Sequence, residues 1–332
     1  MTFRNWPRAV VLVFLATMAI SQMLPQRATA EVLVVDRLTN SVFAYTDTGS
    51  FINTVVSDSV NLNQPDGVLV SPDLTKLFVA SSQSNTVVRY DYNYAAATAS
   101  NPTVIATAAD GLAFPNSMVY SPAGDKIYVA NLGGTGISQI DPNGGSAGAN
   151  FGGGTSFSFS GLAYAPGGEL LAGGFDGGTV AISNAGITSM SDFVAPDPLL
   201  NGAAGVLVNG NDLYVTGLFT GFLQKFNATT GAVDAAFNVS GLASPQGMIA
   251  DPAGSGFLVG ILGISNGEGY ISRFSFDGTP GATFALPSYP NGFSEATAFV
   301  HVPEPATALL AAIGLVGLGL VRMGLVARRR AT

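Results

Sequence analysis

Residues at one position of a repeated pattern carry side chains suited to binding a cation or a small polar ligand. In chain order this position holds Asp66, Asn116, Ser160, Ala204, Gln246 and Glu295. The copies follow one another at roughly 42 to 50 residues, the length of a propeller blade. Carboxylate and amide oxygens around one axis are ligands that Ca²⁺ accepts, six to eight at a time. The chemistry predicted here is cation binding by Asp66, Asn116, Gln246 and Glu295, or solvation of a wet channel by the same polar groups.

The pattern that places these residues is clearest at residues 65–92, PDGVLVSPDLTKLFVASSQSNTVVRYDY. Three alternating apolar runs are separated by polar turns, which predicts three strands. Related stretches begin at Pro115, Ser160, Ala204 and Pro245. With 42 glycines and 18 prolines the composition favours short strands and tight turns, so we expect an all-β fold.

The two ends of this body complement each other. Residues 294–301 form a lone strand with no partner strands after it, whereas residues 32–57 lack a strand before them. We therefore expect a six-bladed β-propeller over residues 31–302, with one blade closed by both ends, because closure removes open sheet edges. A seventh blade stays open if residues 93–109 hide extra strands.

Charge and residue types exclude several functions. Residues 31–302 hold six basic and twenty acidic residues, a net charge near −14, so nucleic acid is not an expected partner. The chain has no cysteine, which excludes disulfides and thiolate chemistry. His301 is the only histidine, and its place beside the C-terminal segment speaks against a serine triad. We predict no catalytic residue and no cofactor, with Ca²⁺ as the possible exception. Asp91, Asp141 and Asp277 end third strands and favour turn capping over metal binding.

The first 30 residues are typical of a secretory signal peptide. Arg4 and Arg8 precede an apolar run, and the segment closes in Ala28-Thr29-Ala30, an A-x-A cleavage site. An uncleaved anchor is the alternative.

The last 30 residues predict a transmembrane helix at 306–327, long enough to cross a bilayer. Arg328, Arg329 and Arg330 would stay in the cytoplasm, which leaves the body outside. Together with Pro303, Glu304 and Pro305, this segment (303–332) resembles the PEP-CTERM sorting signal of Gram-negative bacteria. The resemblance implies an exosortase as partner, removal of the helix, and delivery to the cell surface or an exopolysaccharide matrix. A simple membrane anchor is the alternative.

The repeats resemble the NHL, YVTN and gluconolactonase-type propellers, through SPDLTKLFVASSQSNTVVRYD and SPAGDKIYVANLGGTGISQID. This resemblance implies the fold, and it suggests a carboxylate and amide metal site that Ser160 and Ala204 would leave incomplete. Two functions follow as hypotheses. The first is an exported, non-enzymatic binding or structural protein of the cell surface, with an exopolysaccharide or another surface component as partner. The second is a metal-dependent lactonase or esterase with its site at the channel mouth.

Overall fold

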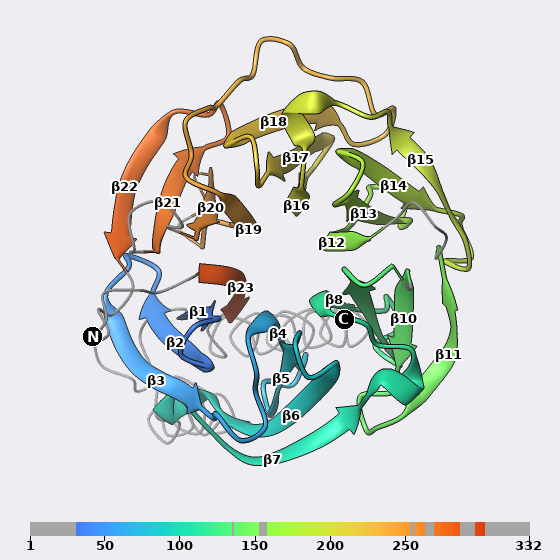
Figure 1. Cartoon of the computed structure of the whole chain (residues 1–332). Coiled ribbons are helices and arrows are strands. Elements are labelled where there is room, and N and C mark those ends of the chain that lie inside the picture. Colours follow the sequence, from blue (N-terminus) through green and yellow to red (C-terminus); the bar gives the residue numbers. More distant parts are fainter. Residues whose placement is uncertain are drawn as a thin grey trace, which may run out of the picture. The chain divides into compact units, whose positions relative to one another are not determined.

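The body of the chain folds into a closed ring of β-sheets. The computed structural model describes residues 31–302 apart from 135, 153–157, 253, 255, 263–268 and 286–295, with the backbone alone for 285 and 296–302. These residues fall within one compact unit. They form six antiparallel sheets around a central axis, which is the six-bladed β-propeller that the repeats predict (Figure 1).

Each sheet is one blade, and its strands run outward from the axis. Blade 1 contains β23 (Ala296–Val302), β1 (Glu31–Asp36), β2 (Ser41–Thr46) and β3 (Phe51–Ser57). Blade 2 contains β4 (Pro65–Val70), β5 (Lys76–Ser81), β6 (Thr86–Asn93) and β7 (Thr98–Ala106). Blade 3 contains β8 (Pro115–Tyr120), β9 (Ile127–Asn131), β10 (Ile137–Ile140) and β11 (Ser146–Phe151).

The second half of the ring follows the same order. Blade 4 contains β12 (Phe159–Tyr164), β13 (Leu170–Gly174), β14 (Thr179–Ser183) and β15 (Met190–Val194). Blade 5 contains β16 (Ala203–Asn209), β17 (Asp212–Gly217) and β18 (Phe222–Asn227). Blade 6 contains β19 (Pro245–Ala250), β20 (Gly256–Ile261), β21 (Tyr270–Ser275) and β22 (Pro280–Ala285). Within the described residues, three short 3₁₀ turns lie between strands: η1 (Tyr94–Ala96), η2 (Ala108–Asp110) and η3 (Pro198–Leu200).

Blade 1 closes the ring as the sequence predicts. The backbone of β23 pairs antiparallel with β1, so that His301 lies opposite Val32 and Val302 lies opposite Glu31. The last strand of the body thereby becomes the innermost strand of the blade that begins it. Residues 93–109 form the outer strand of blade 2 with η1 and the start of η2, not a seventh blade.

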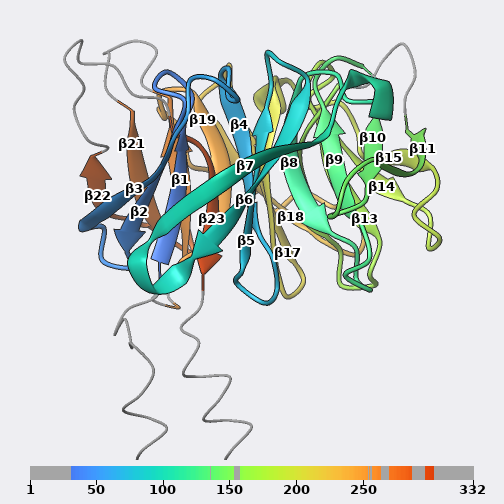
Figure 2. The same cartoon turned by 90° about the horizontal axis from the view of Figure 1, so that it is seen from below.

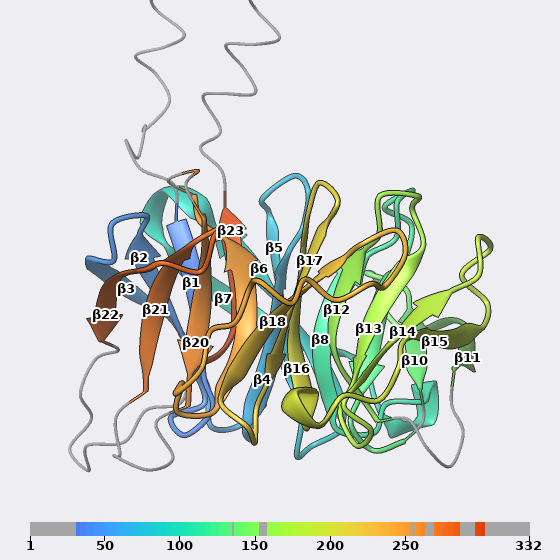
Figure 3. The ribbon, with the colours of Figure 1, turned by 90° about the horizontal axis from the view of Figure 1, so that it is seen from above.

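The core lies between neighbouring blades, because side chains on a strand alternate between its two faces. In β1, Leu33 and Val35 pack toward blade 2, while Val32 and Val34 pack toward blade 6. Both faces of each blade are therefore covered, which explains why inner strands read as continuous apolar runs. Figures 2 and 3 show the blades standing side by side with their inner strands along the axis.

The repeated turns set the strand directions. After the inner strands of blades 2 to 6 the chain reverses through a tight turn, and Gly124, Gly168 and Gly254 take left-handed φ values of 73°, 95° and 81° there. Leu74 takes the same conformation in blade 2, with φ of 59°. We call the opposite face, where the inner strands begin, the mouth face. The turn after β1 (residues 37–40) and the links between blades also lie on the mouth face, since strands alternate in direction.

Two features differ from the three-stranded repeat that the sequence suggests. Five of the six described blades have a fourth, outer strand, which is half exposed and therefore lacks the continuous apolar run of the inner strands. In blade 5 the segment after β18 takes this place through single bridges from Phe226 to Val233 and from Leu223 to Val239.

The predicted signal peptide (1–30) and sorting segment (303–332), with its helix at 306–327, lie outside the described residues. Among the residues that the structure describes, no helix is long and apolar enough to span a bilayer.

Candidate functional site

The repeated polar position lies at the second residue of each described inner strand from β4 to β19. Asp66, Asn116, Ser160, Ala204 and Gln246 all occupy it, and each is at most 6% exposed. These residues thus form a ring at the mouth face, which we call the mouth ring. Glu295, the sixth predicted member, lies outside the described residues, one position before β23.

Glycine follows the mouth-ring residue in several blades and lets the inner strands approach closely. A Cβ atom added at Gly67 would lie 1.8 Å from the carbonyl oxygen of Asn116. At Gly161 and Gly205 it would lie 2.2 Å from the carbonyl oxygens of Ala204 and Gln246. Any side chain at these positions would push neighbouring blades apart, so the glycines fix the diameter of the ring.

Below the mouth ring lies a cavity of about 230 Å³ on the propeller axis. Asn116, Ala204 and Gln246 line its upper end. Most other side chains lining it are apolar: Val68, Leu69, Met118, Val119, Leu162, Val206, Met248 and Ile249. The channel therefore joins a polar entrance to an apolar interior.

Asn116 and Gln246 belong to inner strands on opposite sides of this cavity, because β8 and β19 begin blades three places apart in a ring of six (Figure 1). Ser160 donates a hydrogen bond from Oγ to Asn116 Oδ1 over 3.2 Å, which leaves the Asn116 Nδ2 group as a donor. Among the described residues, no group accepts from Asn116 Nδ2 and none donates to Gln246 Oε1.

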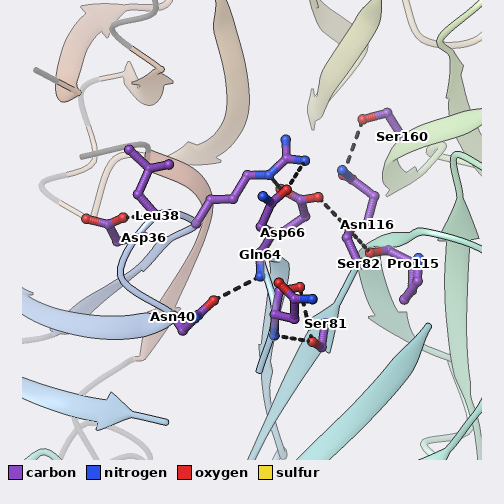
Figure 4. Close-up of polar contacts among 12 residues, drawn as sticks. Asp36, Leu38, Asn40, Gln64, Asp66, Ser81, Ser82, Pro115, Asn116 and Ser160 are labelled. Carbon is purple, nitrogen blue, oxygen red and sulfur yellow. Dashed lines mark hydrogen bonds and ion pairs between the residues drawn. The ribbon is translucent and has the colours of Figure 1, made fainter. Parts of the chain in front are cut away.

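Asp66 takes no part in lining the cavity. Its Oδ2 atom lies 2.5 Å from Ser82 Oγ, which is also 2.7 Å from the carbonyl oxygen of Pro115. Its Oδ1 atom lies 3.7 Å from Arg37 Nε (Figure 4). Arg37 in turn donates to Gln64 Oε1 over 2.9 Å, which holds the guanidinium over the carboxylate. Asp66, the carboxylate of the mouth ring that the structure describes, thus forms an ion pair with Arg37.

The described residues do not fit a calcium site. A dication beside Asp66 would stand close to the Arg37 guanidinium, which repels it. Asn116 Oδ1 already accepts from Ser160, and Ala204 offers no side-chain ligand. Within the described part of the chain, no three acidic or histidine side chains gather closely enough to hold a metal.

The other residues considered as metal ligands have structural partners. Backbone N–H groups of Asn143 and Thr279 donate to Asp141 and Asp277, so these two carboxylates cap turns. Asp91 instead pairs with Lys76 and accepts from Asn101 Nδ2 over 2.8 Å. Several residues singled out in the sequence lie outside the described part of the chain. They are the side chain of His301, the sorting residues Pro303, Glu304, Pro305 and Arg328–Arg330, and the cleavage residues Ala28 and Ala30.

Apolar side chains surround the mouth ring at the surface. Five large, exposed apolar side chains belong to the described turns and links of the mouth face: Leu38, Val60, Phe114, Leu199 and Phe219. Phe219 is 63% exposed and packs edge-on against Phe175, with ring centroids 5.3 Å apart. Sequence reasoning missed this rim because single apolar residues in polar turns carry no periodic signal.

Sequence reasoning also missed Arg37 and Ser82. Both lie outside the repeated position: Ser82 follows β5, the strand that pairs with β4 in the same blade as Asp66, and Arg37 follows β1 in the neighbouring blade. A signal was nevertheless present, since Arg37 is one of only six basic residues in the body.

Comparison with known proteins agrees with the propeller fold. The model of the SMP-30/gluconolactonase/LRE-like region matches residues 25–150, which include Asp66 and Asn116. No curated protein matches the sequence.

Solved structures of several different proteins share the fold. Virginiamycin B lyase from Staphylococcus aureus is 12% identical with a TM-score of 0.55, over 80% of this chain and 84% of the lyase. A chain of a nidogen/laminin complex is 12% identical with a TM-score of 0.61, over 82% and 98% of the two chains. A putative 6-phosphogluconolactonase from Bacteroides fragilis is 14% identical with a TM-score of 0.58, over 83% and 99%. At these identities the likeness establishes the fold alone.

Proposed function

We propose that this chain is an exported, non-enzymatic β-propeller that binds a small ligand in its central channel at the cell surface or in the extracellular matrix. One observation carries the proposal most. An axial cavity of about 230 Å³ with a mostly apolar lining lies below a ring of polar residues, while the described carboxylate of that ring, Asp66, is held by Arg37 and Ser82. Such a site is equipped to hold a ligand and has no described group positioned to activate water.

Export and sorting are part of the same proposal. The A-x-A site ending in Ala30 would release the body at Glu31, and the segment 303–332 would deliver it through an exosortase. The strand β1 begins at Glu31 and β23 ends at Val302, so both processing sites would fall next to the folded body without cutting into it. Mass spectrometry of the exported protein tests this. A C-terminus near Pro303 supports sorting, whereas a retained helix at 306–327 supports a plain membrane anchor.

Binding is tested with the exported protein and the polysaccharide and small-molecule fractions of its own matrix. We expect a fraction that is retained by the wild-type protein and released by Gln246→Leu, since that substitution changes a residue that lines the cavity. Equal retention by both proteins would place any binding elsewhere and contradict the channel as the site.

A metal-dependent lactonase or esterase is the second candidate. It is favoured by the gluconolactonase-region match, which includes Asp66 and Asn116 at the starts of neighbouring inner strands. Calorimetry with Ca²⁺ and lactone turnover by the wild type and an Asp66→Ala, Glu295→Ala variant decide the matter. Calcium binding and turnover that both depend on these carboxylates would replace the binding proposal.

A further inference from the structure

We propose that the mouth face carries a second binding site, outside the channel, for a stretch of a neutral polysaccharide. This site goes beyond the proposed function, because it does not depend on the channel or on its ligand. It is a cleft of about 310 Å³ between the turn that joins β13 to β14 (residues 175–178) and the link between blades 4 and 5 (residues 195–202). That volume lies at the lower end of ordinary small-molecule pockets.

Backbone contacts hold the two walls of this cleft together. The N–H of Asp197 donates to the carbonyl oxygen of Gly178 over 3.0 Å, and the N–H of Gly202 donates to that of Phe175 over 3.2 Å. Gly178 permits this approach, since a Cβ atom there would lie 2.7 Å from the carbonyl oxygen of Asp197. On its other side the link is bound to blade 5 by a hydrogen bond from Leu218 N to Gly202 O over 2.9 Å. The cleft is therefore formed before a ligand binds, which lowers the entropic cost of binding.

Three polar side chains line the cleft within reach of solvent, since Asp176 and Asn201 are exposed and Asp197 is half-buried. Asp176 accepts from Ser158 Oγ through Oδ2, and Asp197 caps η3 by accepting from Leu199 N through Oδ1 over 2.9 Å. Each carboxylate uses one oxygen to hold the fold and, among the described residues, keeps the other to accept from a ligand. Carboxylates only accept hydrogen bonds, whereas the amide of Asn201 both donates and accepts.

An aromatic pair borders the cleft on the same face. Phe175 directly precedes Asp176, and the ring of Phe219 lies against Gly202, where an added Cβ atom would be 2.7 Å from Phe219 Cδ2. The two rings meet edge to face, and Phe219 remains 63% exposed. A large exposed aromatic ring beside polar groups often indicates a binding surface.

This combination of groups matches a sugar ring. A pyranose presents hydroxyl groups around its edge, which can donate to the two carboxylates, and a flat C–H face, which can pack on an aromatic ring. A peptide strand brings a carbonyl acceptor with every N–H donor, and among the side chains that line the cleft only Asn201 donates. The cleft is therefore better matched to a polyol than to a peptide.

The charge around the cleft favours an uncharged sugar. Residues 127–224 contain no Lys or Arg, so the two carboxylates have no basic neighbour from that stretch of chain. A uronic-acid polymer would bring its own carboxylates against them and be repelled. Calcium is poorly served as well, because within the described part of the chain no three acidic or histidine side chains gather to hold a metal.

The test uses the exported protein, with cellohexaose and chitohexaose as neutral probes and hexagalacturonate as the acidic one. Isothermal titration calorimetry should show binding of a neutral probe and about tenfold weaker binding of hexagalacturonate. Saturation-transfer NMR should give the strongest transfer to the C–H protons of one sugar face, since that face would pack on Phe219. Failure of both neutral probes to bind, or tighter binding of hexagalacturonate, would overturn the proposal.

Two pairs of variants locate the site. Asp176→Asn should weaken binding about tenfold, because a charged acceptor is lost, while Asp192→Asn, which changes an exposed carboxylate outside the cleft, should alter it less than about twofold. Phe219→Leu should weaken it about tenfold, while Phe114→Leu, which changes another exposed ring of the mouth face, should not. All four replaced side chains are exposed, so the thermal unfolding of each variant should stay close to that of the wild type. Equal binding within either pair would overturn the proposed site.

The outcomes also separate this site from the channel. Binding of a neutral probe that is lost in Gln246→Leu but kept in Asp176→Asn would place the sugar in the channel and overturn this inference, while the proposed function stands. Binding that depends on Asp176 and Phe219, with no matrix fraction released by Gln246→Leu, would support the cleft and contradict the channel. Calcium uptake that Asp176→Asn abolishes, without sugar binding, would assign the cleft to a cation and overturn the proposal.

Discussion

Single side chains hold neighbouring blades together at the mouth face, and Asp58 is the best example. It lies in the link between blades 1 and 2 and accepts from the hydroxyl of Tyr90 in blade 2 over 2.9 Å. It also accepts from the backbone N–H groups of Val60 and Asn61. Burial alone would raise the pKa of Asp58, but these hydrogen bonds outweigh it and lower the pKa below 3.8.

Replacing Asp58 by Ala should destabilise the propeller by about 2 kcal/mol at neutral pH, since a turn cap and a charged hydrogen bond are lost together. The lowered pKa means that the contribution is full above 3.8 and disappears as pH falls through the folded-state value. Urea unfolding of the wild type and the Asp58→Ala variant, at neutral pH and below pH 3.8, measures the difference in their free energy of unfolding. Tyr90→Phe should lose only part of that stability. A difference between wild type and Asp58→Ala that does not depend on pH would contradict the role of the charge.

At the scale of the strand, the glycine that follows four of the five described mouth-ring residues decides how closely blades can meet. Gly205 shows this best, because its Cβ position lies 2.2 Å from the Gln246 carbonyl oxygen and 3.0 Å from Thr216 Oγ1. Thr216 Oγ1 accepts from Gly205 N over 2.7 Å and donates to that same carbonyl over 3.0 Å. The backbone of blade 6 is therefore bound to blade 5 at the point where a methyl group would have to fit.

Gly205→Ala should cost about 3 kcal/mol of folding free energy, because backbone atoms, which cannot rotate aside, stand in the way. Gly186→Ala is the control, since its Cβ would meet no atom nearer than 3.9 Å, and we expect a change within about 0.5 kcal/mol. Thermal unfolding of the two variants gives the comparison. Equal stability of both would show that the inner strands can separate without loss.

The strands and their order in the ring could be predicted from the sequence because both follow from local patterns of apolar and polar residues. The alternation in residues 65–92 and its recurrence identify the blades, and the unpaired run before the tail identifies the closing strand. Outer strands such as β11 (Ser146–Phe151) were missed, since half-exposed, glycine-containing segments lack that alternation.

The site could be predicted only in part. The repeat predicted that Asp66, Asn116 and Gln246 lie in one ring, because this follows from their equivalent positions in the repeat. Which way each side chain points depends on contacts distant in sequence. Asp66 turns to Ser82 and Arg37, whereas Asn116 and Gln246 line the cavity.

For the whole molecule, closure by β23 is the contact that makes the ring continuous. It supplies β1 with its inner partner along the register from Glu31 to Asp36. Without it β1 becomes an open edge, and the faces of blades 2 and 6 next to the axis lose a neighbour.

We therefore expect two truncations to behave differently. A chain ending at Val302 should keep a cooperative thermal transition and remain monomeric in size-exclusion chromatography. A chain ending at residue 295 should lose that transition and associate through the exposed edge. If both unfold alike, the closing strand contributes little to the ring.

Four tyrosines in four blades, of which Tyr90 and Tyr214 are buried and Tyr120 and Tyr164 half-buried, should also couple alkaline titration to unfolding. Burial raises the pKa of Tyr120 to about 12, and it raises the pKa values of Tyr90, Tyr164 and Tyr214 as well. A tyrosine whose pKa is raised in the folded state stabilises the fold at pH values below its unfolded pKa of 10.0. This contribution is lost as the pH rises through the pKa of the folded state. Phenolate absorbance and β-sheet circular dichroism should change together above pH 10.0. Phenolate formation with the sheet signal intact would contradict this coupling.

The pairing of Glu31 with Val302 at the end of blade 1 remote from the mouth ring has a practical meaning for attachment. Both residues lie side by side on the face of the propeller opposite the mouth ring. A fluorescent or affinity tag fused next to either residue should therefore begin on the face remote from the entrance.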